Sequence, residues 1–388
     1  MKIIIATDSF KESLSALDVA IHIQKGFMEV FPNACYIKCP VADGGEGTVV
    51  TMIESIQGSI VEAEVTGPLG NKVCAFLGLS RDKTCAFIEM AAASGLALVP
   101  PEKRNPLITT SFGTGELIKA ALDQGARRFI IGIGGSATND GGAGMIQALG
   151  GRLLDKRGRQ IPFGGGGLAK LDKIDVSGMD KRLLSCQFHI ACDVTNPLLG
   201  EYGASAIFGP QKGATKKTIV QLDNNLAHFA YVIKRDLNIE VADVPGAGAA
   251  GGMGAALLAF FRSELKPGFD IIAESLKLKE IIRDADLVIT GEGRIDNQSI
   301  NGKVPIGVAH LAKAHGIPVI VIAGCFGDGV EEVYAHGIDS AFSILNKVTT
   351  LTGALGNASE NIHVCARNIA HTLKIGQRLK TGRCESPC

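Results

Sequence analysis

The sequence predicts a two-domain α/β protein, in which a parallel-sheet domain of the Rossmann/flavodoxin-like type carries an inserted mixed α/β domain. Near both ends of the chain, short apolar runs rich in β-branched residues alternate with amphipathic helices, which is typical of a buried parallel sheet. The middle begins instead with alternating strands joined by tight turns. The 388 residues suffice for two domains with their own cores. We therefore expect residues 1–64 and 283–380 to form one discontinuous domain, and residues 65–282 the inserted one.

Composition narrows the class of protein. Lysine plus arginine equals aspartate plus glutamate, 39 each, so no net charge favours nucleic acid or an anionic membrane as partner. No stretch has the length of a membrane span, and the first apolar run, residues 3–6, is too short for a signal peptide. The ten cysteines include no Cys-x-x-Cys pair, so we expect reduced thiols in a cytoplasmic protein.

The first 60 residues predict a β-α-β-α succession. Residues 2–7 form an apolar strand, and Ser15 with Asp18 marks the start of a helix whose apolar positions recur up to residue 30. A second strand is expected at 35–39. The loop at 43–47 then opens a helix that runs to about residue 57.

The middle of the chain predicts a meander of three strands, followed by alternating strands and helices. The expected strands are 60–66, 73–77, 84–88, 128–133 and 188–193, and the expected helices are 116–123, 143–149, 215–235 and 255–262.

The last hundred residues return to the βαβ style of the first sixty. Strands are expected at 287–290 and 318–323, and helices at 303–315 and 356–374. Residues 381–388 have no apolar pattern, so we expect a disordered tail.

A glycine-rich loop at residues 132–144 follows the strand expected at 128–133. Glycines allow backbone N–H groups to approach an anion closely, and the polar side chains of the loop suit a phosphate together with hydrated Mg²⁺. The candidate phosphate-binding residues are Gly134, Gly135, Ser136, Thr138 and Asn139, and Asp140 is a candidate Mg²⁺ ligand. The alternative is a turn that needs several positive φ angles.

Five polar loops follow expected strands, at residues 8–11, 43–46, 134–140, 193–196 and 291–296. Because they lie far apart in the chain, we expect them to meet only in the cleft between the domains, where small-molecule sites usually lie.

The residue types of these loops suit phosphoryl transfer, which depends on positioning, Mg²⁺ and cations more than on a strong nucleophile. Asp193 is a candidate Mg²⁺ ligand or base, and Asp8 and Asp296 are candidate bases; each is alternatively a cap or turn acid. Lys11 and Arg294 are candidates to bind a substrate carboxylate or the transferred phosphoryl group, or else form surface ion pairs.

A second glycine-rich segment, residues 246–251, matches G-x-G-x-x-G but follows no convincing strand. A close-packed helix start is the better interpretation, and Gly248 and Gly251 are candidates for a second phosphate contact. The chain has neither a G-x-x-x-x-G-K-[ST] motif nor the protein-kinase signatures, and no His-x-x-x-His spacing for zinc.

Seven separated motifs, in order along residues 1–378, resemble the bacterial class I glycerate kinases. They are ATDSFKESLS (6–15), ADGGEGT (42–48), GIGGSATNDGG (132–142), CDVTNPL (192–198), FGPQKG (208–213), PGAGAAGGMG (245–254) and ITGEGRID (289–296).

The resemblance implies ATP-dependent phosphorylation of D-glycerate with Mg²⁺, with 2-phosphoglycerate as product and a role in sugar-acid or glyoxylate catabolism. It also implies two α/β domains with the site in the cleft between them. The individual roles of the acidic residues stay open, and a homo-oligomer is compatible with the sequence. Two alternatives are an NAD(P)-dependent oxidoreductase of a small hydroxy acid, using the loop at Gly246, and a non-catalytic sugar-acid sensor.

Overall fold

The computed structural model describes residues 1–45, 47–297, 299–300 and 303–381. The chain divides into two compact units: unit 1 comprises residues 1–43 and the chain from 272 onwards, and unit 2 comprises residues 44–271. Glu46 of the predicted loop at 43–46 and residues 382–388 of the predicted tail lie outside the described residues.

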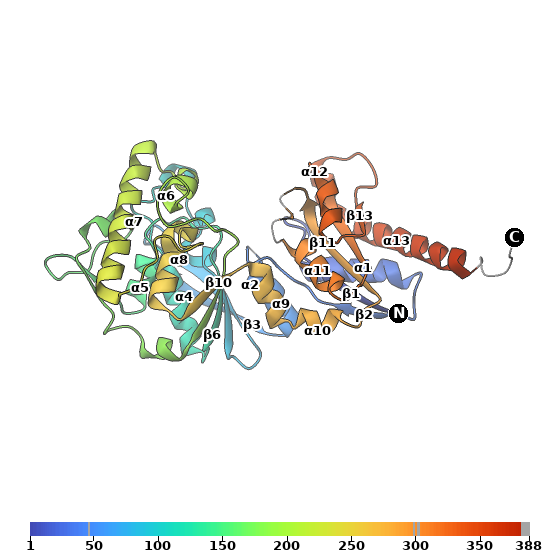
Figure 1. Cartoon of the computed structure of the whole chain (residues 1–388), viewed down its shortest axis with the longest axis horizontal. Helices are drawn as coiled ribbons and strands as arrows, with labels where there is room; N and C mark the ends of the chain where they lie inside the picture. The colour runs from blue at the N-terminus through green and yellow to red at the C-terminus, as the bar shows by residue number, and fades with distance from the viewer. Residues whose placement is uncertain (46, 298, 301–302, 382–388) are drawn as a thin grey trace. The chain divides into compact units, whose positions relative to one another are not determined.

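Unit 1 is built on a parallel sheet whose described strands lie in the order β13-β12-β11-β1-β2 (Figure 1). The strands are β1 (Lys2–Thr7), β2 (Cys35–Lys38), β11 (Leu287–Ile295), β12 (Val319–Phe326) and β13 (Ser340–Ser343). From β1 the chain adds β2 on one side, and later adds β11, β12 and β13 on the other. This is the doubly wound order of flavodoxin-like sheets, and the direction of winding reverses between β1 and β11.

Helices cover the sheet of unit 1. The helices α1 (Ala16–Met28) and α13 (Ala358–Thr381) pack against one face, where their apolar residues join those of β1 and β11. The Ser15 side chain accepts a hydrogen bond from the Asp18 backbone N–H, which confirms the predicted helix start. The remaining helices are α10 (Leu278–Ile282), α11 (Val304–Lys313) and α12 (Leu351–Gly356), and α9 (Gly268–Ser275) spans the boundary between the units.

Unit 2 contains a mixed sheet in the order β10-β9-β6-β5-β4-β3. The expected meander forms its antiparallel part, and β5, β6, β9 and β10 run parallel. The strands are β3 (Ser59–Thr66), β4 (Lys72–Leu79), β5 (Cys85–Glu89), β6 (Arg128–Gly132), β9 (Gln187–Ala191) and β10 (Ser263–Lys266), with a separate hairpin of β7 (Arg152–Leu154) and β8 (Lys173–Asp175).

Most helices of unit 2 share one large apolar core with this sheet. They are α3 (Ala91–Ser94), α4 (Phe112–Asp123), α5 (Ala143–Ala148), α6 (Ala204–Phe208), α7 (Lys216–Leu237) and α8 (Ala249–Phe260). The helix α2 (Thr48–Ile56) packs against β4 and β5. Short 3₁₀ turns lie at Leu96–Leu98, Pro101–Lys103, Gly167–Lys170, Lys181–Ser185, Pro210–Lys212 and Val330–His336 of the chain. Among the described residues, no helix is long and apolar enough to cross a membrane.

The structure differs from the predicted elements at two places that matter for the site. β11 does not stop at Thr290, because its pairing with β12 continues to Ile295, so most of the predicted polar loop at 291–296 is strand. The helix expected from Ala255 is preceded by a kinked turn, in which Ala250, Gly251 and Gly252 have positive φ angles.

Candidate functional site

In unit 1, Asp8 lies directly after β1 and its carboxylate is buried. Its Oδ1 accepts a hydrogen bond of 2.6 Å from the Ser9 backbone N–H. Burial, together with the nearby negative charges of Asp43 and Glu292, raises the pKa of Asp8 to about 7. A carboxylate with a pKa near neutrality can take a proton from a hydroxyl group, which is the chemistry of a general base.

Glu292, on β11, is a second buried carboxylate of unit 1, and the sequence analysis did not single it out. The Ser299 hydroxyl donates a hydrogen bond of 2.5 Å to its Oε1, and Lys303 Nζ lies 3.8 Å from the same oxygen. Burial raises the pKa of Glu292, while the bond from Ser299 and the charge of Lys303 oppose that rise. The glutamate lies within the quoted motif at 289–296, but only the fold shows that it is buried.

Arg294 and Asp296 form an ion pair with each other, since Arg294 Nε lies 3.1 Å from Asp296 Oδ2. Their side chains project from the end of β11 and from the residue just after it. The Arg294 side chain is 64% exposed, so the pair adds little to stability, and its guanidinium is accessible to a ligand. The sequence left two roles open for Arg294, a surface ion pair and ligand binding, and this geometry is compatible with both.

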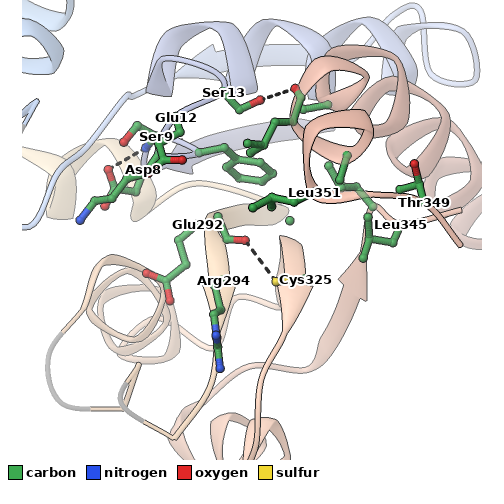
Figure 2. A pocket seen from close by; sticks show the side chains of 18 of the residues that line it. Asp8, Ser9, Glu12, Ser13, Glu292, Arg294, Cys325, Leu345, Thr349 and Leu351 are labelled. Atoms are coloured by element: carbon green, nitrogen blue, oxygen red, sulfur yellow. Dashed lines mark hydrogen bonds between the residues drawn. The ribbon is translucent and has the colours of Figure 1, made fainter. Parts of the chain in front are cut away.

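A cavity of about 980 Å³ lies within unit 1 at the carboxyl ends of its strands. Figure 2 shows Asp8, Glu292 and Arg294 at one end, and Leu345 and Leu351 at the other. The charged lining residues are Asp8, Lys11, Glu12, Asp43, Glu292, Arg294, Lys303 and Lys347. The structure therefore brings Asp8, Lys11 and Arg294 of the predicted set together.

The loop after β1 is a tight turn that precedes α1. Glu12 has a φ of 63°, and a bridge between Phe10 and Leu14 turns the chain back on itself. Within this loop, the Ser9 backbone N–H donates its hydrogen bond to the Asp8 carboxylate.

In unit 2, the glycine-rich loop connects β6 to α5, as predicted, and Asp140 anchors it from inside. The fully buried carboxylate of Asp140 accepts hydrogen bonds from the Ser111 backbone N–H and hydroxyl, at 2.9 and 2.8 Å. It also accepts bonds from the N–H groups of Gly142 and Gly144, at 3.0 and 3.2 Å. Burial raises the pKa of Asp140 and these bonds oppose the rise. The four bonds favour an anchoring role, and the role as Mg²⁺ ligand stays a prediction.

A buried lysine that the sequence analysis missed, Lys212, fixes the same loop. Its Nζ donates hydrogen bonds of 2.6 Å to the Ser136 hydroxyl and 2.6 Å to the Thr138 carbonyl. Burial lowers the pKa of Lys212 to about 7, and the charge of Asp140 opposes this. Lys212 lies in the quoted motif FGPQKG, but the sequence alone shows neither its burial nor its partners.

Two buried polar atoms of the loop have no hydrogen-bond partner within the described part of the chain: Thr138 Oγ1 and Asn139 Oδ1. The amide nitrogen of Asn139 does have one, donating to the Ser205 hydroxyl at 3.0 Å. Buried polar atoms without partners cost free energy, so they favour a polar ligand or water at this loop. This observation fits the prediction of Thr138 and Asn139 as binding residues and does not test it.

The segment around Gly248 and Gly251 packs against the loop. A Cβ on Gly251 would lie 2.0 Å from the Thr138 carbonyl oxygen, and one on Gly248 would lie 2.2 Å from that of Pro197. The Gly251 carbonyl also accepts a hydrogen bond of 3.0 Å from the Gly141 N–H. Close packing therefore accounts for both glycines, as the sequence favoured, and their contact with phosphate stays a prediction.

Asp193 follows β9 in unit 2 and is exposed. Its Oδ1 accepts a hydrogen bond of 2.9 Å from the Gly268 N–H, at the start of α9, where a negative charge is favourable. Among the described residues, no group of three or more histidine, cysteine or acidic side chains could hold a metal ion. Mg²⁺ at nucleotide sites usually takes only one or two carboxylates, with phosphates and water completing its coordination.

The fold of unit 1, the charged cavity and the glycine-rich loop are those of an α/β enzyme that handles small anionic ligands. The family model described as the Glycerate kinase family matches residues 3–374, and the chain belongs to that family.

Similar proteins agree with this assignment. The chain is 62% identical to the glycerate 2-kinase of Escherichia coli K12 over 378 residues, covering 97% of this chain and 99% of that protein. It is 57% identical to the glycerate kinase of Bacillus subtilis 168, covering 98% and 99%. A crystal structure described as a glycerate kinase 2 from Salmonella typhimurium LT2 matches with 60% identity and a TM-score of 0.91, covering 97% and 99%. The predicted mixed α/β fold and the predicted family are thus confirmed.

Proposed function

We propose that this protein transfers the γ-phosphoryl group of ATP to D-glycerate and forms 2-phosphoglycerate. The observation that carries this proposal is the 62% identity, over nearly the whole of both chains, to a glycerate 2-kinase. The buried carboxylate of Asp8 beside the cationic side chains of the cavity in unit 1 suits a hydroxyl acceptor that also carries a carboxylate. No observation favours the oxidoreductase or the sensor.

In the proposed step, Asp8 accepts the proton of the glycerate 2-hydroxyl while the oxygen of that hydroxyl attacks the γ-phosphorus of ATP. The bond from that phosphorus to the bridging oxygen breaks, and ADP leaves with the bond's electron pair. Lys11 and Arg294 bind the glycerate carboxylate or the charge of the transferring group. Asp296 holds the Arg294 guanidinium through their ion pair, so we assign it a positioning role beside its predicted one as base.

The ATP phosphates are proposed to contact the glycine-rich loop at Gly134, Gly135 and Ser136. Lys212 stabilises that loop through its hydrogen bond to the Ser136 hydroxyl. Mg²⁺, when bound, neutralises phosphate charge. Asp193 suits it better than Asp140, because Asp140 already accepts four hydrogen bonds from the protein. The cytoplasmic location and the role in sugar-acid or glyoxylate catabolism remain expectations from the resemblance.

The test is ³¹P NMR of purified protein with D-glycerate, ATP and Mg²⁺. A new phosphomonoester signal that matches 2-phosphoglycerate supports the proposal in full. A 3-phosphoglycerate signal keeps the kinase and contradicts the regiochemistry. Unchanged ATP, with no new ester, contradicts the proposed function.

A further inference from the structure

The cavity of unit 1 has an apolar part that the proposed chemistry of glycerate leaves unused. Beyond the charged residues near Asp8, its wall includes the apolar side chains of Phe10 after β1, Ile344 and Leu345 after β13, and Leu351 and Leu355 of α12, interspersed with Asn346, Lys347, Thr349 and Thr350. Figure 2 shows Leu345, Thr349 and Leu351 in this part. Glycerate is a three-carbon acid in which every carbon bears oxygen. It suits the charged end, and it has no apolar surface to place against these side chains.

The volume of the cavity points the same way. At about 980 Å³ it lies near the upper end of the range of roughly 300–1,000 Å³ that is typical of sites for drug-sized ligands. A ligand much larger than glycerate, with one charged and one apolar end, fits this volume and lining.

The rim of the apolar part exposes large hydrophobic side chains close together in the chain. Leu345, Val348 and Leu351 are 45%, 103% and 74% exposed. They line the cavity above Phe10 and Ile344, which are buried. The Ser13 hydroxyl donates a hydrogen bond of 2.8 Å to the Leu355 carbonyl and so ties α12 to the loop after β1. The apolar wall is therefore held in place on the body of unit 1.

The topology of the sheet locates a ligand at the same place. In open, doubly wound sheets, ligands bind outside the carboxyl ends of the strands, at the point where the winding reverses. In unit 1 this point lies between β1 and β11, whose ends carry Asp8 and Arg294. Both residues line the cavity.

We propose that the apolar part of this cavity binds the base and ribose of a purine nucleoside triphosphate, the phosphoryl donor, with its phosphates directed towards Lys11, Arg294 and Lys303. The flat base packs against Leu345 and Leu351, and the three cations attract the phosphates. This inference rests on the proposed function for the identity of the donor. It adds to the proposed function a nucleoside-binding surface that lies within unit 1.

The test compares Leu351→Asp with the matched control Ile375→Asp. Leu351 is the first residue of α12, where an acidic side chain is favourable, so the variant should fold. Ile375 is a 56% exposed residue of α13 that does not line the cavity. We expect Leu351→Asp to weaken ATP binding, measured by titration calorimetry without glycerate, by about tenfold or more, and Ile375→Asp to leave it unchanged. The KM for glycerate should stay within about twofold in both variants.

A second measurement uses Cys325, a free thiol on the cavity wall, with Cys74 of unit 2 as an exposed reference. Adenosine should slow the alkylation of Cys325 by iodoacetamide, read peptide by peptide in a mass spectrometer, and should leave Cys74 unaffected. Equal alkylation of Cys325 with and without adenosine contradicts the inference.

The outcomes separate this inference from the proposed function. Wild-type ATP affinity in Leu351→Asp overturns the inference, even where ³¹P NMR shows 2-phosphoglycerate. The opposite case is also distinguishable. If the wild type binds ATP but forms no phosphoglycerate, and Leu351→Asp abolishes ATP binding, the nucleoside site is supported and the proposed function is contradicted. A change of molecular mass in light scattering, with unchanged ATP affinity, assigns the rim to contact between copies of the chain and overturns the inference.

Discussion

Lys212 and Ser136, which are 76 residues apart in the sequence, are joined inside unit 2 by a hydrogen bond of 2.6 Å from the lysine Nζ to the serine hydroxyl. The lysine side chain is 1% exposed, and a second bond of 2.6 Å holds the Thr138 carbonyl. A buried ammonium group is costly unless its hydrogen bonds are satisfied, so these two bonds bind the lysine and the loop to each other. The loop conformation thus depends on a residue outside it.

Replacing Lys212 should therefore impair the loop. We expect Lys212→Met to lower kcat/KM for ATP by about 100-fold, because Ser136 and the Thr138 carbonyl lose their donor, at a cost of about 1–3 kcal/mol per unsatisfied group. Steady-state kinetics on folded protein, checked by circular dichroism, measure this effect. Unchanged kinetics in the methionine variant would remove Lys212 from the proposed function.

The same variant gives a pH-dependent stability with a defined sign. The pKa of Lys212 is about 7 in the folded state, against 10.5 for a lysine side chain in water, so the unfolded chain binds more protons between these values. Stability from this group therefore rises with pH from about 7 towards 10.5. We expect the free energy of unfolding of the wild type, minus that of Lys212→Met, to increase between about pH 7 and pH 9 in urea titrations. A flat or falling difference contradicts the assignment.

Asp8 should control the pH dependence of turnover. Because its pKa is raised to about 7 and the base must be ionised, kcat should rise with pH and level off above about 7. We expect Asp8→Asn to lower kcat by about a thousandfold and to remove this limb. Asp284→Asn, which changes an exposed carboxylate of the same unit, is the control and should keep the wild-type profile.

Stability should respond to Asp8 in the opposite direction from Lys212. A raised carboxyl pKa means that the folded state binds more protons between pH 3.8 and about 7, so stability from this group falls as the pH rises through that window. Asp8→Asn should therefore be more stable than the wild type at about pH 8, and the gain should shrink towards about pH 4. Thermal unfolding at both pH values measures it, and a gain that is equal at both contradicts the raised pKa.

Gly251 should be intolerant of a side chain for two separable reasons. Its φ is 67°, and a Cβ would lie 2.0 Å from the Thr138 carbonyl oxygen. Gly200 has a φ of 85° with nothing within 4 Å of such an atom, so Gly200→Ala measures the backbone strain alone, about 1–2 kcal/mol. We expect Gly251→Ala to cost at least about 3 kcal/mol, because overpacking adds to the strain. If urea unfolding shows the same loss of stability in Gly251→Ala and Gly200→Ala, the close contact with Thr138 does not add to the destabilisation, and the prediction is wrong.

The sequence was informative where a local pattern determines the structure. The apolar β-branched run at 2–7 became β1, and the capping side chain of Ser15 marked the start of α1. The glycine-rich loop and Asp8 were also visible, because polar groups that follow a buried strand have few structural explanations.

Lys212 and Glu292 escaped because their environments come from distant parts of the chain. Nothing local distinguishes a buried lysine from a solvated one. The burial that lowers the pKa of Lys212 arises only in the folded chain, where its side chain binds Ser136 and Thr138. The extension of β11 to Ile295 likewise depends on pairing with β12, so the sequence placed Arg294 in a loop. Such features depend on tertiary contacts, which the hydrophobic pattern of a single segment does not reveal.

Asp193 offers the sharpest separation of a structural from a chemical role. Its Oδ1 accepts the Gly268 N–H at 2.9 Å, and asparagine can keep that bond while it removes the charge that a metal ion needs. If Asp193 binds Mg²⁺, Asp193→Asn and Asp193→Ala should both lose turnover by at least about a hundredfold, and both should need more Mg²⁺ for half-maximal rate. If it only caps α9, Asp193→Asn should match the wild type and Asp193→Ala should lose about 1 kcal/mol of stability. We expect the first pattern, and Mg²⁺ titrations of the two variants with saturating ATP and glycerate decide between them.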